Sequence, residues 1–116
     1  MNLLTIVIPC YNERESLPLL IEKLNELSDK INFLIVDNGS TDESTEYLTK
    51  IKSSLNNIDI FFIEKNKGYG YGVFKALNSI QNSQYIGWIH GDLQFDFESL
   101  KNTLKFFENS DNNDLI

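Results

Sequence analysis

Polar residues gather where three predicted strands end. Apolar runs at residues 4–9, 33–36 and 85–89 are each followed at once by side chains that bind ligands or move protons. The runs lead into Cys10-Tyr11-Asn12-Glu13, Asp37-Asn38-Gly39-Ser40-Thr41-Asp42 and His90-Gly91-Asp92-Leu93-Gln94. In an open parallel sheet, ligands sit beyond the carboxyl ends of the strands, where the chain turns into helices. The sequence therefore predicts one site that is assembled from three loops.

The last of these loops has the composition of a metal site. His90, Asp92 and Gln94 alternate along an extended stretch, so their side chains can converge on one point. Such ligands suit Mg²⁺ or Mn²⁺, which completes its shell with water and substrate phosphates. Local sequence alone favours a simpler alternative, in which Asp92 caps a turn and His90 makes a hydrogen bond in the core.

The first two loops offer contacts for a nucleoside. Asp37 can accept a hydrogen bond from a ribose or a base edge, although local sequence alone favours an Asx turn within residues 37–40. Tyr11 presents an aromatic face on which a base could stack, and Glu13 lies beside it as an acceptor. An exposed loop with Glu13 at a helix start explains these two residues equally well.

A basic, glycine-rich turn is a further candidate. Lys67 and Gly68 belong to residues 65–72, where backbone amides at a helix start and the lysine charge could meet a phosphate. The Gly-x-Gly-x-Gly spacing matches neither the dinucleotide fingerprint nor the ATP-phosphate loop. Close packing of the helix against the sheet is the alternative explanation of these glycines.

The elements that must position these loops alternate between strand and helix. Apolar residues at helical spacing predict a helix capped by Ser16 and a second one capped by Ser40 or Thr41. A third helix follows the glycine-rich turn, and a fourth begins near Asp96. Strands are expected at residues 4–9, 32–36, 58–63 and 85–90. This order predicts an α/β fold, a doubly wound and mostly parallel sheet of four or five strands with helices on both faces.

Composition restricts the partners and the compartment. The 116-residue chain has a net charge of −7, which argues against sequence-independent nucleic-acid binding. Its one cysteine, Cys10, cannot form an intramolecular disulfide, and no secretion signal is visible. No apolar run approaches the roughly 20 residues of a transmembrane segment. We therefore expect one cytoplasmic domain over residues 1–116.

Together and in order, these motifs resemble the inverting family 2 glycosyltransferases, and most closely their polyisoprenyl-phosphate, dolichol-phosphate-mannose-synthase-like branch. The resemblance is carried by residues 9–13, 36–42, 66–68 and 91–94. It implies a GT-A fold whose Rossmann-like N-terminal half binds a nucleotide-diphosphate sugar with Mg²⁺ or Mn²⁺. The implied nucleoside contacts are Pro9, Tyr11, Glu13 and Asp37, and the implied metal ligands are Asp92 and Gln94.

The same resemblance implies a lipid-phosphate or saccharide acceptor, cell-envelope polysaccharide biosynthesis, and a location in the cytoplasm or at the inner membrane face. His90 stands where the metal motif usually has its first aspartate, so metal affinity or donor contacts can differ. The family's general base comes from sequence beyond such a half. We therefore expect a truncated nucleotide-sugar-binding domain without an assigned catalytic residue.

Other classes of protein share the winding or the length. A phosphorylation-dependent receiver domain needs an acidic cluster after its first strand, where this chain has Pro9-Cys10-Tyr11. A sugar-nucleotide pyrophosphorylase carries a glycine- and arginine-rich loop at that place, and none is present. A non-catalytic nucleotide-binding or interaction module stays open, and so does a homo-oligomer that covers a sheet edge.

Overall fold

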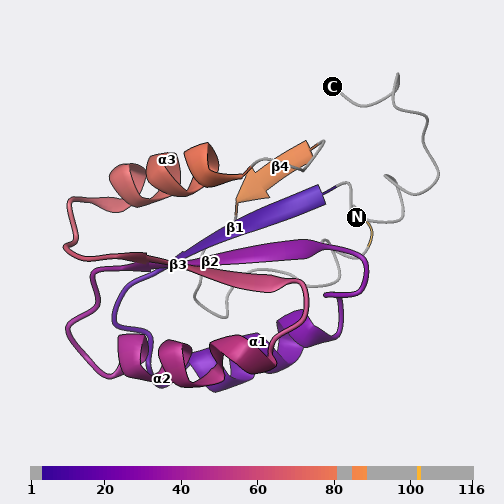
Figure 1. Ribbon diagram of the computed structural model, residues 1–116, viewed down its shortest axis with the longest axis horizontal. Helices are drawn as coiled ribbons and strands as arrows, with labels where there is room; N and C mark the ends of the chain where they lie inside the picture. Colours follow the sequence, from indigo (N-terminus) through magenta and orange to yellow (C-terminus); the bar gives the residue numbers. More distant parts are fainter. Residues whose placement is uncertain (1–3, 81–84, 89–101, 103–116) are drawn as a thin grey trace.

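The computed structural model of the protein describes residues 4–80, 85–88 and 102, and strands alternate with helices along it (Figure 1). The strands are β1 (Leu4–Cys10), β2 (Asn32–Asn38), β3 (Ile58–Ile63) and β4 (Tyr85–Trp88). The helices are α1 (Leu17–Asn25), α2 (Ser44–Ile51) and α3 (Tyr69–Ser79), and the short 3₁₀ helix η1 (Lys52–Ser54) follows α2. The expected alternation is confirmed, whereas the helix expected near Asp96 lies outside the described residues.

The four strands form one parallel sheet in the order β3-β2-β1-β4. Strands β1, β2 and β3 are added in one direction, and the chain then returns to place β4 on the other side of β1. The winding therefore reverses between β1 and β4. In a doubly wound sheet, ligands bind beyond the carboxyl ends of the strands at such a reversal.

Helices cover both faces of the sheet, as the sequence predicted. Figure 1 shows α1 and α2 on one side and α3 on the other. All seven residues of β1 are buried, as expected for a strand between two helical layers. The first face packs on α1 and α2 through a cluster that includes Ile6, Ile8, Leu20, Leu24, Phe33, Ile35 and Leu48. On the other face, Val7, Leu34 and Val36 pack against Ala76 of α3.

Two helix starts differ from the prediction. The hydroxyl of Ser16 does not cap α1, although the residue precedes this helix. Helix α2 begins at Ser44, so neither Ser40 nor Thr41 caps it. Glu43 is the residue that precedes this helix, and its side chain makes no capping hydrogen bond. The carboxylate of Asp42, one residue earlier, accepts a hydrogen bond from the Ser44 amide at 2.8 Å.

Strand β2 extends to Asn38, two residues further than predicted, so Asp37 lies inside the strand opposite Cys10. None of the described helices combines the length and the hydrophobicity that a membrane span needs.

Candidate functional site

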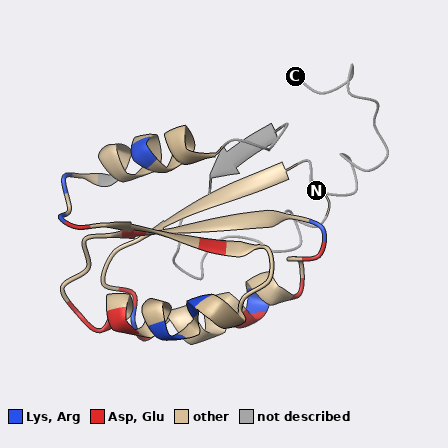
Figure 2. Ribbon diagram, viewed as in Figure 1, with Lys and Arg blue, Asp and Glu red and all other residues tan. Residues whose placement is uncertain are grey.

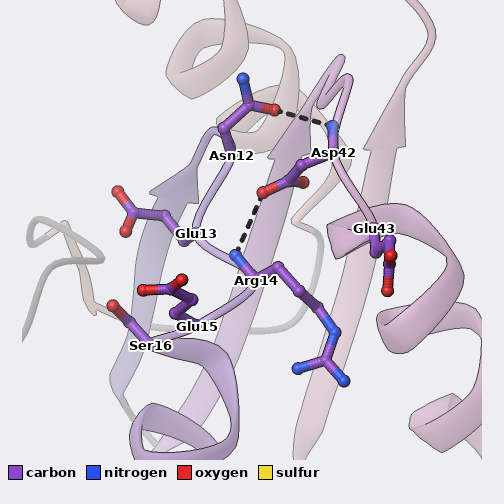
Figure 3. Close-up of a pocket in the computed structure, with 7 residues that line it drawn as sticks. All are labelled: Asn12, Glu13, Arg14, Glu15, Ser16, Asp42 and Glu43. Carbon is purple, nitrogen blue, oxygen red and sulfur yellow. Dashed lines mark hydrogen bonds between the residues drawn. The ribbon is translucent and has the colours of Figure 1, made fainter.

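The loops that follow β1 and β2 are joined by Asn12. Its backbone has a φ of +53°, a left-handed conformation that asparagine tolerates better than most residues. Its Oδ1 accepts hydrogen bonds from the amides of Thr41 at 2.7 Å and Asp42 at 3.1 Å, and the latter is drawn in Figure 3. The backbone N–H of Asn12 in turn donates to the Ser40 hydroxyl at 3.1 Å. The two loops therefore form one unit.

A second set of hydrogen bonds connects the starts of α1 and α2. The Arg14 amide donates to Asp42 at 3.3 Å (Figure 3), and the Glu13 amide donates to the Ser44 hydroxyl at 3.1 Å. Both bonds satisfy amides that precede a helix. Desolvation by burial opposes ionisation of Asp42, but hydrogen bonds from Ser44 and Arg14 outweigh it and lower the pKa of this carboxyl. Asp42 is therefore ionised at neutral pH.

These loops border an acidic cleft of about 440 Å³ (Figure 3). Its lining residues are Asn12, Glu13, Arg14, Glu15, Ser16, Asp42 and Glu43. The guanidinium of Arg14 lies 4.2 Å from the ring centre of Tyr47. Carboxylates accept hydrogen bonds from hydroxyl and base N–H groups but repel phosphates. The cleft therefore suits the nucleoside end of a nucleotide better than its diphosphate end.

Tyr11 and Asp37 lie at the same end of the sheet, as predicted. Tyr11 follows Cys10, which is in register with Asp37, and Pro9 is buried in β1 opposite Val36. The Tyr11 side chain is 42% exposed, so its ring is free for a ligand to contact. A base could therefore stack beside the end of β2.

Asp37 itself is 1% exposed. Its carboxylate accepts hydrogen bonds from the Ser40 amide at 3.4 Å and from the Thr45 hydroxyl. The local turn contact that the sequence offered as an alternative is thus present. A contact between Asp37 and a base or ribose stays a prediction.

The loop after β2 also holds the turn between β3 and α3. Asn38, 3% exposed, donates from Nδ2 to the Gly68 carbonyl at 3.2 Å. Gly39 has a φ of +69°, and a Cβ there would lie 2.3 Å from the Asn66 backbone nitrogen. A Cβ at Gly72 would lie 3.0 Å from Oδ1 of Asn38, so α3 also approaches β2 closely. All three described loops at this edge of the sheet are therefore one framework (Figure 1).

The glycine-rich run is only partly a turn. Gly68 precedes α3 with a φ of +104°, whereas Gly70 and Gly72 lie inside the helix. The packing alternative is thus confirmed for Gly72. Lys67 is exposed, and its Nζ lies 5.3 Å from the ring centre of Tyr71. A second hollow, of about 590 Å³, is lined there by Ile63, Glu64, Lys65, Lys67 and Tyr71.

The three predicted metal ligands, His90, Asp92 and Gln94, lie outside the described residues. Within the described part of the chain, no group of three histidine, cysteine, aspartate or glutamate side chains could hold a metal ion. The chemistry of the predicted donors, a carboxylate with an amide oxygen and an imidazole, suits Mg²⁺ or Mn²⁺.

Sequence reasoning gave no role to Asn12 and Asn38, the two residues that join the loops. Each stands where a strand gives way to a turn, and an asparagine there offers both a donor and an acceptor. Oδ1 of Asn38 is buried without a hydrogen-bond partner, although its Nδ2 is satisfied. Their positions in the sequence were the signal that could have identified them, because Asn12 lies shortly after β1 and Asn38 is the last residue of β2.

Residues 5–116 match the family model "Glycosyl transferase family 2". The chain belongs to glycosyl transferase family 2. Two similar relatives are undecaprenyl-phosphate 4-deoxy-4-formamido-L-arabinose transferases. The one from Photorhabdus laumondii is 32% identical over 109 residues, which is 90% of this chain and 33% of that protein. The one from Yersinia enterocolitica is 34% identical over 95 residues, 78% of this chain and 29% of that protein. This family 2 chain thus spans about a third of the length of these relatives.

Solved structures confirm the expected GT-A fold of this family 2 chain. S. aureus TarS 1–349 superposes with a TM-score of 0.73 at 21% identity, over 93% of this chain and 32% of that one. The mannosyltransferase PcManGT from Pyrobaculum calidifontis gives a TM-score of 0.51 at 23% identity, over 68% of this chain and 24% of the mannosyltransferase chain. The family match confirms the resemblance seen in the motifs and sets aside the receiver domain and the pyrophosphorylase.

Replacing Asn12 with glycine should destabilise the fold by about 1–2 kcal/mol, because the amides of Thr41 and Asp42 lose their acceptor. Glycine keeps the left-handed backbone accessible, so the change isolates the side chain. Urea unfolding of Asn12→Gly and of the exposed control Asn25→Ala measures the difference. Equal midpoints for Asn12→Gly and the unmodified protein would show that Asn12 does not hold the two loops together.

Cys10 should make stability fall as the pH rises above 9. Burial, together with the charges of Glu13 and Asp37, raises the pKa of its thiol from 9.0 to about 12. Between these values the folded chain keeps a proton that the unfolded chain has lost, so the free energy of unfolding falls by up to about 1.4 kcal/mol per pH unit. Urea unfolding at pH 8 to 10.5 should show a steeper decline than in Cys10→Ala. Identical slopes in the two proteins would contradict a buried, protonated thiol.

Proposed function

We propose that this chain is the donor-binding part of a glycosyltransferase that transfers a sugar from a nucleoside diphosphate to a polyisoprenyl phosphate. Membership of family 2 and the names of the curated relatives support this assignment. The observation that carries it is the placement of exposed Tyr11 at the carboxyl end of β1, the strand that borders the reversal of the sheet winding, next to the buried end of β2. This is where doubly wound folds bind nucleotides.

In this proposal, the base stacks on Tyr11 and the backbone at Pro9 supports that loop. Asp37 accepts hydrogen bonds from the base or ribose, and Glu13 accepts another from the acidic cleft. Thr45 and the Ser40 amide each hold one oxygen of the Asp37 carboxylate, so a ligand reaches this 1% exposed group only by displacing one of these partners. The Asn12 bridge maintains the spacing between the two loops.

The diphosphate end needs positive charge, and Arg14 is the one cation among four carboxylates in the lining of the cleft. Lys67 and the turn at Gly68 lie on the part of the framework that is fixed by Asn38, and they would contact the phosphates. Asp92, with Gln94 and His90, would hold Mg²⁺ or Mn²⁺. When bound, the ion would neutralise the charge that develops on the leaving diphosphate.

The reaction would be a direct displacement at the anomeric carbon. An oxygen of the acceptor phosphate forms the new bond, while the bond from this carbon to the nucleoside diphosphate breaks. An ionised phosphate needs less help from a general base than a hydroxyl does. The lipid acceptor would place the reaction at the cytoplasmic face of a membrane.

A thermal-shift screen of UDP, GDP and other nucleoside diphosphates, with and without Mn²⁺, tests this proposal. We expect a Mn²⁺-dependent rise in Tm for one nucleotide that is lost in Asp92→Ala and kept in Asp29→Ala, a change at an exposed residue. Equal rises in Asp92→Ala and the unmodified protein would remove Asp92 as the metal ligand. No rise with any nucleotide would favour a non-catalytic interaction module.

A further inference from the structure

Helix α3 carries an exposed surface that is both aromatic and basic. Its inner side buries Val73 and Ala76 against the sheet. Residues three and four apart share a helix face, so Tyr71, Phe74 and Lys75 lie together on the opposite side. Phe74 is 61% exposed, which makes it the most exposed large apolar side chain among the described residues. We refer to Lys67, Tyr71, Phe74 and Lys75 as the α3 stripe.

The lysines of the α3 stripe converge on one ring. The Nζ atoms of Lys67 and Lys75 lie 5.3 and 5.6 Å from the ring centre of Tyr71. Residues 65–80 contain three lysines and no aspartate or glutamate, in a chain with 17 acidic and 10 basic residues. Figure 2 shows a basic residue and no acidic one on α3, whereas α1 and α2 on the other face carry both signs. Glu64 borders the segment on its N-terminal side.

We propose that the α3 stripe docks on an anionic lipid surface. Phe74 would enter the boundary between headgroups and acyl chains, and Tyr71 would lie at headgroup level. Lys75 would lay its apolar stem along the interface and pair with a lipid phosphate, whereas Lys67, which is assigned to the donor phosphates, would add only its positive charge to this surface. This inference goes beyond donor binding, because it assigns the surface through which the domain meets its membrane.

Other occupants of the α3 stripe fit the observations less well. A second copy that paired stripe to stripe would bring like charges together, which disfavours a symmetric interface. A free phosphate would be bound by the lysines but would leave Phe74 exposed. An anionic membrane uses both the charge and the exposed ring. Binding should be weak and sensitive to salt, because the net charge of −7 opposes it.

Vesicle sedimentation tests this assignment. The protein should sediment with vesicles that contain phosphatidylglycerol and stay in solution with pure phosphatidylcholine. Lys75→Glu should lower the partition coefficient at least about fivefold, the effect of one lysine near an anionic surface. Phe74→Ser should lower it by a similar factor, because the apolar ring no longer enters the interface. Matched changes on the opposite side of the sheet, Lys50→Glu in α2 and Leu19→Ser in α1, should leave binding unchanged.

Circular dichroism of each variant establishes that it is folded. If Phe74→Ser and Lys75→Glu bind like the unmodified protein, or if the protein binds both kinds of vesicle equally or neither, the α3 stripe is not a membrane surface. The nucleotide-dependent rise in Tm should be kept in Phe74→Ser. Loss of vesicle binding with this rise intact therefore separates the present inference from the proposed function.

Discussion

Gly39→Ala is expected to destabilise the protein by about 2–4 kcal/mol, the largest effect of any single methyl group in the described site. The left-handed backbone at a φ of +69° costs an alanine about 1–2 kcal/mol. The new Cβ would also lie 2.3 Å from the Asn66 nitrogen and 2.7 Å from the Lys65 carbonyl carbon, so backbone must move. Urea unfolding measures the loss.

Gly70→Ala is the matched control for Gly39→Ala. This residue lies in α3, and apart from its chain neighbours and the backbone of its own helix no atom is within 4 Å of the position its Cβ would take. Alanine there should be neutral or should stabilise the helix by up to about 1 kcal/mol. If Gly39→Ala and Gly70→Ala change the free energy of unfolding equally, the backbone of Lys65 and Asn66 does not pack against Gly39. The turn between β3 and α3 would then not be fixed to the loop after β2.

Tyr11→Ala is expected to weaken nucleoside diphosphate binding by about 5- to 150-fold while the fold stays intact. Stacking of a base on an aromatic ring contributes about 1–3 kcal/mol in alanine substitutions. The side chain is 42% exposed, so its removal should change stability by less than about 0.5 kcal/mol. Calorimetric titration measures affinity, and urea unfolding measures stability.

Tyr11→Phe serves as the companion of Tyr11→Ala, because it keeps the ring and removes only the hydroxyl. Retained affinity in Tyr11→Phe with loss in Tyr11→Ala supports stacking. Equal affinity in Tyr11→Ala and the unmodified protein would place the base elsewhere.

The strands were predictable because their signal is local. The apolar run Ile58–Ile63 has the bounds of β3, and β1 exceeds its predicted range by one residue, Cys10. Burial on both faces requires such runs, so composition alone reveals them. The parallel pairing of the strands follows from the same alternation, whereas the reversal of the winding after β3 does not, because alternation leaves the strand order open.

The start of α2 was not predictable, because a contact between distant residues determines it. Ser40 with Glu43 has the spacing of a capping box, but the Ser40 hydroxyl accepts from the backbone amide of Asn12, 28 residues earlier in the chain, and the Ser40 amide donates to Asp37. The clamp from Asn38 to Gly68 is likewise a contact over 30 residues. Local sequence patterns do not reveal hydrogen bonds between residues so far apart in the chain. The loops were therefore predicted, whereas the hydrogen bonds that join them were not.

The most direct test of the shared nucleotide site is a titration of nucleoside diphosphate into the ¹⁵N-labelled protein, followed by NMR. The amide signals of Tyr11, Glu13 and residues 37–42 should shift together and saturate at one ligand concentration, because one base contacts both loops. Shifts confined to α1 or to the edge strand β3, with these amides unchanged, would contradict a donor site at the ends of β1 and β2.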